Sequence, residues 1–167
     1  MTRRYWLMKS EPAVYSFDDL LGEPEQTDHW DGVRNYLARN NMMEMKHGDS
    51  VLFYHSSATP PHVAGIAEVA REAYPDHTAW DPKSKYHDPK SFADNPRWYM
   101  VDIRAVRKLE AAVTLPELKA NPKLKDMQVV RKGQRPSVQP VMKEEFKEVL
   151  WMAREKAKEG GSRRREK

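Results

Sequence analysis

The amino-acid sequence predicts an α+β fold, a small mixed β-barrel flanked by short helices. Strand-like segments follow one another without regular helices between them, and most of the helical segments are short. Residues 50–55 are apolar at nearly every position, which is typical of a central strand covered on both faces. The other segments expected to be extended are residues 5–8, 63–74, 97–109, 128–131 and 137–140.

Capping residues predict where three short helices begin. Ser16 followed by Asp19 is a capping-box pattern, so a helix is expected to start there and to stop near Gly22. Thr114 and Asn121, each closely followed by a proline, predict two further short helices that end by about residue 127.

Apolar spacing predicts two longer helices. One begins at Val33, with Val33, Tyr36 and Leu37 facing inward. The other is the last element of the chain and is expected to end at Gly160-Gly161. Its inward stripe is expected to contain Met142, Phe146, Val149, Leu150 and Ala153.

The connection at residues 75–96 is unusually long for a compact domain, and loops of this length are often functional. It contains Asp-Pro-Lys-Ser twice, at residues 81–84 and 88–91, and each copy is expected to start a short turn. Gly65, within the strand that precedes this loop, predicts a bulge or a close approach of another group to the backbone.

The chain has 167 residues, which is enough for one domain with a substantial core. We expect this domain to cover residues 1–153 and to be followed by a basic, disordered tail at 154–167. The tail has seven Lys/Arg and three Asp/Glu, so it accounts for the whole formal net charge of +4. It could attract phosphates, or it could be a solvated end without function.

Composition excludes several classes of site. The sequence has no cysteine, which excludes disulfides, thiolate metal sites and a cysteine nucleophile. Its six histidines show no metal-ligand spacing, so neither a metal nor another cofactor is expected. No run approaches the ~18 apolar residues of a membrane span, and the N-terminus lacks a signal sequence. We therefore expect no membrane contact and a cytoplasmic protein, or a nuclear one if its source is eukaryotic.

No catalytic residue is predicted. His55 and Ser56 could supply a base and a hydroxyl, but adjacent strand residues point to opposite faces and cannot form a nucleophile–base pair. The sequence also lacks a Gly-x-Ser-x-Gly elbow, a P-loop and a Gly-x-Gly-x-x-Gly motif.

Residues 30–41 form the most informative stretch. Trp30 and Gly32 lead into a helical pattern that carries Arg34, Asn35 and Arg39. Such a helix start could hold a planar, hydrogen-bonding or anionic ligand. The alternative is an ordinary amphipathic helix with solvated Arg and Asn side chains, and from this stretch alone the alternative is favoured.

Aromatic and polar side chains also recur where other strands and helices end. Each of them alone is more often structural than functional. Together they offer a flat aromatic surface, hydrogen-bonding groups for a polar base edge and cations for phosphates, which suits a flipped nucleobase. The candidate binding residues are Lys9, Ser10, Trp30, Arg34, Asn35, Arg39, Tyr54, His55, Ser56, Trp98, Ser137 and Gln139.

Seven stretches of the sequence also resemble a known family. The sequence resembles the EVE domain family of the PUA-like superfamily, which is similar in fold to YTH domains. The match covers nearly all of the chain up to about residue 153, and its first four stretches together are specific. The matching stretches are residues 5–12, 30–35, 38–40, 48–49, 53–56, 95–98 and 137–140.

The resemblance implies a mixed β-barrel whose pocket binds a modified, for example methylated, base in DNA or RNA without catalysis. It implies that Trp30 is a pocket aromatic, and that Tyr54 and Trp98 belong either to the pocket or to the core. One departure is Pro136, where the family usually has leucine. Proline fixes φ and lacks a backbone donor, so the approach to Ser137 is altered. The groups implied around Trp30 are Lys9, Ser10, Arg34, Asn35, His55 and Ser56.

Three hypotheses about function stay open at this point. The first is a monomeric reader of a modified base, in which Asn35, His55 or Ser56 bonds to the modification. The second is an enzyme that acts on a modified nucleotide or a small nucleotide-like ligand in the same pocket, with His55 as acid or base. The third is a protein–protein adaptor that uses the proline-rich loop at residues 75–96.

Overall fold

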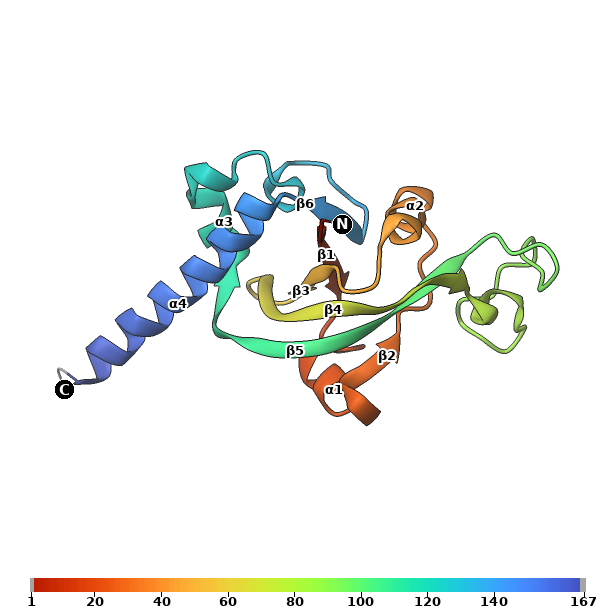
Figure 1. Cartoon of the computed structure of the whole chain (residues 1–167), viewed down its shortest axis with the longest axis horizontal. Coiled ribbons are helices and arrows are strands. Elements are labelled where there is room, and N and C mark those ends of the chain that lie inside the picture. Colours follow the sequence, from red (N-terminus) through yellow and green to blue (C-terminus); the bar gives the residue numbers. More distant parts are fainter. Residues whose placement is uncertain (1, 166–167) are drawn as a thin grey trace.

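The computed structural model describes residues 2–165, with side chains described up to residue 160. It contains one six-stranded mixed sheet with the strand order β2-β5-β4-β3-β1-β6 (Figure 1). Strands β1 and β3 pair in parallel, and the other neighbours are antiparallel. The strands are β1 (Tyr5–Ser10), β2 (Thr27–His29), β3 (Ser50–His55), β4 (His62–Pro75), β5 (Tyr99–Thr114) and β6 (Val138–Val141).

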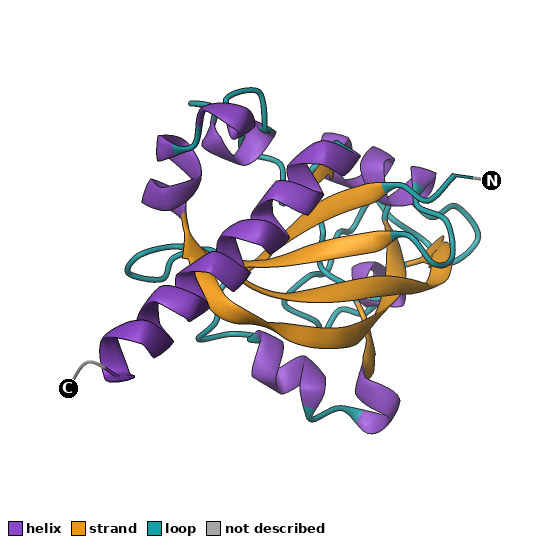
Figure 2. Cartoon of the chain, turned by 60° about the vertical axis from the view of Figure 1, so that its left-hand side comes forward, coloured by secondary structure: helices purple, strands orange, loops and turns teal. Residues whose placement is uncertain are grey.

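Helices surround this sheet, and α4 lies obliquely across the strands (Figure 2). Four short 3-10 turns lie in the connections, at Pro24–Gln26, His77–Trp80, Pro122–Leu124 and Gln128–Val130. The α-helices are α1 (Phe17–Leu21), α2 (Tyr36–Glu44), α3 (Leu115–Ala120) and α4 (Lys143–Arg165).

The α+β class is confirmed, but closure of the sheet into a barrel is not. Within residues 2–165, β2 and β6 are the two edges of an open sheet and do not pair with each other. The sheet is nevertheless strongly curved, because β4 and β5 form a long hairpin whose register shifts at four places (Figure 1). Such bulges bend and twist a strand pair without closing it.

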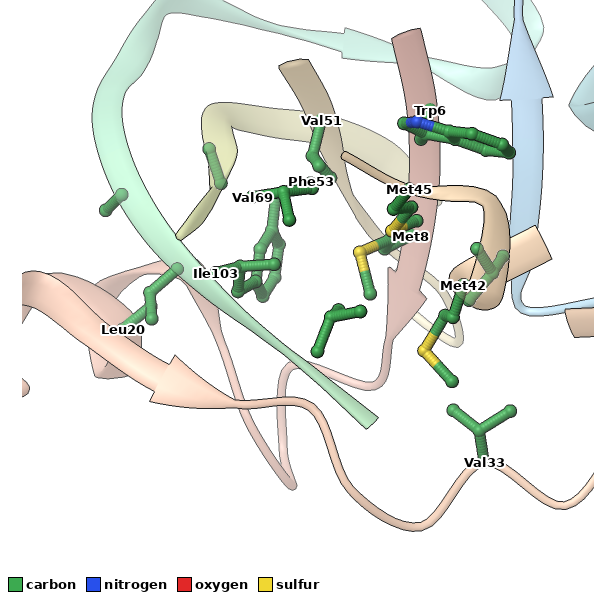
Figure 3. Packing of buried hydrophobic residues seen from close by; sticks show 14 of the residues in the cluster. Trp6, Met8, Leu20, Val33, Met42, Met45, Val51, Phe53, Val69 and Ile103 are labelled. Carbon is green, nitrogen blue, oxygen red and sulfur yellow. The ribbon is translucent and has the colours of Figure 1, made fainter. Parts of the chain in front are cut away.

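Apolar residues alternate across the sheet and build a core on each face. In β3, Val51 and Phe53 join one buried cluster, and Leu52 and Tyr54 join the other. This confirms the expected central strand, since β3 lies between β1 and β4 and is buried on both faces. The first cluster, which includes Trp6, packs under α1 and α2 (Figure 3).

A buried carboxylate holds the start of the sheet. Asp49, 2% exposed, accepts hydrogen bonds from the backbone N–H of Arg4 and Lys46 and from the indole Nε1 of Trp6, each at 3.0 Å. The carboxylate therefore joins the first residues of β1 to the turn before β3, which is the pair of strands that leads to the cavity described below.

Capping and turn predictions are confirmed. Ser16 and Asp19 form a reciprocal capping box at α1, as Thr114 and Glu117 do at α3. Asn121 caps the 3-10 turn that follows α3. Each Asp-Pro-Lys-Ser copy forms a turn in which the aspartate side chain accepts from the backbone N–H two residues later.

The expected helix at Val33 begins later and is rotated. Asn35 is its N-cap, so Arg34 and Asn35 precede α2 instead of lying on it. Tyr36 and Leu37, expected to face inward, are 50% and 63% exposed. The buried positions include Ala38 and Met42 instead. Val33, the third residue expected to face inward, is buried, but it precedes α2.

Two further expectations are wrong. Within the segment 128–131, expected to be a strand, Gln128–Val130 is a 3-10 turn, and α4 does not end at Gly160-Gly161 but continues to Arg165. Within the inward stripe of α4, Phe146, Val149 and Ala153 are buried, but Met142 is 62% exposed.

The boundary at residue 153 and the disordered tail stay predictions. Part of the predicted tail lies in α4, where the Nζ of Lys156 donates to the carbonyl of Ala112 and to Glu117. Residues 166–167 of that tail lie outside the described residues.

Replacing Gly65 by alanine tests how closely the first core cluster is packed. A Cβ at this position would lie 2.3 Å from the ring of Phe17, which is buried and in edge contact with Phe53. We expect Gly65→Ala to lower the free energy of unfolding by about 1–3 kcal/mol, as overpacked cores do. Gly160→Ala is the control, because a Cβ added there would have no atom within 4 Å. Denaturant unfolding measures both, and equal stability of the two variants would contradict the close packing.

Candidate functional site

A cavity of about 690 Å³ lies beyond the end of β1. Its walls come from parts of the chain that are far apart in sequence: the end of β1, the segment before α1, the segment from β2 to α2, the long loop after β4, and the residue before β6. The lining residues used below are Lys9, Ser10, Val14, Tyr15, Asp28, Trp30, Asp31, Gly32, Val33, Arg34, Lys85, Tyr86 and Ser137.

Three aromatic side chains line the cavity. Trp30 is held by its backbone N–H, which donates to the carbonyl of Val101 at 2.7 Å, and its ring meets Phe53 edge-on at 5.5 Å. Tyr86 lies against Gly32, where a Cβ would come within 2.6 Å of the ring. Gly32 has φ of +79°, so both the turn and the close ring require glycine. The third ring is that of Tyr15.

Carboxylates and a lysine face the same cavity. Burial raises the pKa of Asp31, and the negative charges of Asp76 and Asp28 act in the same direction. Burial lowers the pKa of Lys9, whose ammonium donates to the carbonyl of Gln134 at 3.2 Å. The cavity thus combines hydrogen-bond acceptors with a donor in a partly dehydrated setting.

The hydroxyl of Tyr15 is a second donor. Its oxygen is buried and has no hydrogen-bond partner among the residues that the structure describes. Burial and the nearby Asp28 carboxylate raise the pKa of Tyr15, so the hydroxyl keeps its proton. A buried polar group without a partner costs about 1–3 kcal/mol, and the Asp28 carboxylate is the acceptor that lies near this hydroxyl.

One ion pair holds two walls of the cavity together. Asp76, fully buried, accepts from the guanidinium of Arg34 at 3.0 Å and from the backbone N–H of Gly32 at 2.9 Å. It also accepts from the backbone and hydroxyl of Thr78 at 2.9 and 2.6 Å. Arg34 donates in turn to the carbonyl of Tyr86.

The chain matches the family model described as "EVE domain" over residues 4–152. It belongs to the EVE domain family.

Named relatives agree with this membership. Thymocyte nuclear protein 1 of Homo sapiens is 43% identical over 163 residues, covering 87% of this chain and 72% of the relative. The structure of human THYN1 in complex with DNA containing 5-methylcytosine is 42% identical, covers 90% of this EVE domain chain and 97% of the other, and superposes with a TM-score of 0.85.

A more distant structure shares the fold. The YTH domain of the Zygosaccharomyces rouxii MRB1 protein, solved with N6-methyladenosine RNA, has a TM-score of 0.51 and 14% identity. The alignment covers 90% of this chain and 86% of the YTH chain. At this identity the likeness shows that the two proteins have a similar fold.

Five of the predicted site residues line the EVE domain cavity together, and the other seven lie outside its lining. The binding role of all twelve stays a prediction. The five that meet at the cavity are Lys9, Ser10, Trp30, Arg34 and Ser137. Those outside it are Asn35, Arg39, Tyr54, His55, Ser56, Trp98 and Gln139.

His55 takes part in a chain of hydrogen bonds behind the cavity. Its Nε2 accepts from the backbone N–H of Phe17 at 3.0 Å, so its hydrogen lies on Nδ1, 3.1 Å from Nε2 of His62. His62 in turn donates from Nδ1 to the carbonyl of Pro60 at 3.0 Å. Both imidazoles are neutral in this arrangement. The neighbouring Ser56 donates its backbone N–H to the carbonyl of Ser10 at 2.9 Å.

The other residues outside the cavity have structural contacts. The Oδ1 of Asn35 caps α2 by accepting from the N–H of Ala38. Tyr54 is 3% exposed and belongs to the core cluster on the opposite face of the sheet. The amide of Gln139 donates to the carbonyls of Gln134 and Pro136, which holds the loop before Ser137.

Sequence reasoning did not identify several lining residues. Tyr15, Asp28 and Asp31 flank recognised motifs, but nothing in their spacing indicates that β1 and β2 bring them together. Tyr86 lies between the two Asp-Pro-Lys-Ser turns, and the unusual length of the loop was its only signal.

A second hollow, of about 660 Å³, lies over the outer surface of β4 and β5. Two of its charged groups, Arg104 and Glu68, form an ion pair, and Asp102 accepts a hydrogen bond from the hydroxyl of Tyr74. It offers no Phe, Tyr or Trp ring among the lining residues described. The Trp30 cavity is therefore the candidate site.

Over residues 2–165, no group of three or more His, Asp or Glu side chains is arranged to hold a metal ion. In the same part of the chain, no helix has the length and apolar character needed to span a bilayer.

Replacing Asp76 tests the link between the two walls. We expect Asp76→Asn to lower the free energy of unfolding by about 2–4 kcal/mol, because the change leaves the Arg34 charge without its partner. Asp94→Asn is a matched control, since Asp94 is an exposed carboxylate in the same loop. Urea unfolding at pH 7 measures both, and a loss no larger than that of the control would show that the pair is dispensable.

The histidine chain predicts a pH effect on stability. Burial lowers the pKa of His55 from its usual 6.5; nearby His62 and Lys108 add to the decrease, and Asp18 opposes it. The pKa of His55 is therefore lower in the folded protein than in the unfolded chain. The contribution of His55 to the free energy of unfolding is complete above about pH 6.5, and it is lost as the pH falls through the pKa of the folded state.

Denaturant unfolding at pH 7.5 and pH 5 measures this effect. We expect the wild type to lose more stability between the two values than His55→Gln, which does not titrate. Identical pH profiles would mean that His55 does not contribute.

Proposed function

We propose that this EVE domain binds a modified nucleobase of DNA or RNA in the Trp30 cavity and does not alter it chemically. The observation that carries the proposal is the lining itself. Trp30, Tyr15 and Tyr86 provide flat aromatic surfaces next to carboxylates and the ammonium of Lys9. A base extruded from its strand needs both a stacking surface and partners for its polar edge.

The polar groups suit a base of the cytosine type. The carboxylates of Asp28 and Asp31 can accept from the exocyclic amine of cytosine. The ammonium of Lys9 can donate to its carbonyl oxygen. The complex of human THYN1 with DNA containing 5-methylcytosine supports this assignment.

Apolar side chains at the cavity can detect a methyl group. Val14 and Val33 are part of the lining. Burial of one methyl-sized group contributes about 0.8 kcal/mol, and a hydrophobic pocket discriminates such a group by roughly 1–3 kcal/mol. We therefore propose a preference for the modified base of about 10–200-fold.

Flanking phosphates have a different partner from the one that the sequence suggested. Arg34 was expected to bind them, but its guanidinium bonds to Asp76 and Tyr86. Lys85, an exposed residue at the rim, keeps its ammonium available, and its Nζ lies 5.0 Å from the ring of Tyr86. We propose Lys85 as the phosphate contact.

The two alternative functions receive less support. The enzyme hypothesis used His55 as acid or base, and both ring nitrogens of His55 are hydrogen-bonded outside the cavity lining. The loop at residues 75–96 supplies Lys85 and Tyr86 to the cavity, which makes it part of the site instead of a separate adaptor surface. A monomer in the cytoplasm or nucleus stays our expectation, and the human relative is named a nuclear protein.

Trp30→Ala tests the proposal. We expect affinity for an oligonucleotide with one 5-methylcytosine to fall by about 5–150-fold, because stacking contributes roughly 1–3 kcal/mol per base. Trp30→Phe should retain most of the affinity, and Asp31→Asn should weaken cytosine-type bases more than thymine. Fluorescence anisotropy at one fixed salt concentration measures all of these.

The result is interpretable only if the variants fold, so urea unfolding of each accompanies the titrations. Equal affinity of the wild type for modified and plain oligonucleotides would contradict the proposal. Unfolding of Trp30→Ala would place Trp30 in the core instead of the binding site.

A further inference from the structure

We propose that Tyr36 forms a second stacking site, which binds a nucleobase that flanks the one in the Trp30 cavity. The inference rests on the proposed function, since it names a further contact with the same nucleic acid. It concerns a surface outside the cavity lining, at the first residue of α2.

The ring of Tyr36 is exposed and yet fixed in place. Its side chain is 50% exposed, and its ring stacks on that of Trp98 with centroids 4.8 Å apart and planes tilted by 25°. Trp98 is only 5% exposed, and its indole Nε1 donates to Asp88 at 2.7 Å. A ring that is already held on a rigid support loses little entropy when a base stacks on it.

A cation lies beside this ring. The guanidinium carbon of Arg39 is 4.8 Å from the centre of Tyr36 and 5.9 Å from that of Trp98. Its nitrogens donate to the carbonyl of Arg97 and to the side chain of Asn40, which are neutral acceptors. Arg39 has no ion pair with a carboxylate in the described part of the chain, so its charge is available to a phosphate.

The Tyr36 ring lies near one wall of the cavity. Arg34 lines the cavity, and its guanidinium carbon lies 5.6 Å from the ring of Trp98, the same ring that supports Tyr36. The two contacts place the centre of the Tyr36 ring within about 10 Å of that carbon. Successive nucleotides of a duplex strand are about 3.4 Å apart, and more when the strand is stretched. A nucleotide next to a base held beside Arg34 can therefore reach the Tyr36 ring.

The folding of α2 does not explain this exposed ring. The helix buries Ala38 and Met42, whereas Tyr36 and Leu37 lie on its outer side. A single exposed aromatic residue is common and needs no explanation. Here, however, a supported ring, an available cation and a nearby base cavity occur together, which is the combination that single-strand binding proteins use.

The experiment measures a double-mutant cycle between Tyr36 and the flanking base. The probes are single-stranded DNA nonamers with one central 5-methylcytosine, either intact or with an abasic residue on its 5′ or 3′ side. Tyr36→Leu keeps Trp98 covered but removes the aromatic face, and Tyr36→Phe keeps that face. Trp30→Ala serves as the reference for the cavity, and thermal unfolding checks every variant.

We expect Tyr36→Leu to weaken binding of the intact nonamer by about fivefold or more, and Tyr36→Phe to change it by less than about twofold. An abasic residue on one of the two sides should weaken the wild type by a similar factor and leave Tyr36→Leu unaffected. The ratio between modified and plain nonamers should be the same for Tyr36→Leu as for the wild type.

Three outcomes would overturn the inference. If Tyr36→Leu binds like the wild type while Trp30→Ala binds weakly, the second site is wrong and the proposed function stands. A loss in Tyr36→Leu that does not depend on the abasic residue would mean that the ring acts through the structure. If the wild type does not distinguish modified from plain DNA and Trp30→Ala has no effect, the proposed function fails and the second site fails with it.

Discussion

The cavity depends on one buried carboxylate. Asp76 has no contact with solvent, and burial alone would raise its pKa, yet the hydrogen bonds from Thr78, Gly32 and Arg34 keep that pKa below its usual value. Asp76 directly follows β4, and its carboxylate fixes the segment that carries Trp30 through the backbone N–H of Gly32. Because removing one partner of a buried pair leaves an uncompensated charge, the two walls are stable only together. A pair of this kind stabilises a particular arrangement more than it stabilises the fold in general.

This role changes how the basic residues near the cavity are understood. Arginine is well suited to bidentate contacts, and Arg34 uses that ability on Asp76 and on the carbonyl of Tyr86 instead of on a ligand. The ring of Tyr86 then packs against the backbone of Gly32. The aromatic wall is thus set by hydrogen bonds to the backbone, while Lys85 and Lys9 are the lysines that line the cavity.

Local rules predicted much of the fold. The capping boxes at Ser16 and Thr114, and the central position of residues 50–55, follow from neighbouring residues alone. Trp30 and Lys9 could be identified as candidates because they lie where elements end. Tyr86 and Asp76 could not, because their importance comes from contacts with Gly32 and Arg34, more than forty positions away in sequence. The same limit explains Tyr36, since helical spacing does not say which stripe the rest of the chain will cover.

The position of β6 determines when the cavity wall can form during synthesis of the chain. Strand β6 pairs only with β1 in the sheet, and the backbone N–H of Lys9 donates to the carbonyl of Ser137 at 2.8 Å. One wall of the cavity therefore joins the end of the first strand to the residue before the last strand. Until residues 137–141 are synthesised, one edge of β1 is unpaired and open to other chains. Since β6 is the last strand along the chain, this wall of the cavity is completed only after the other strands have been translated.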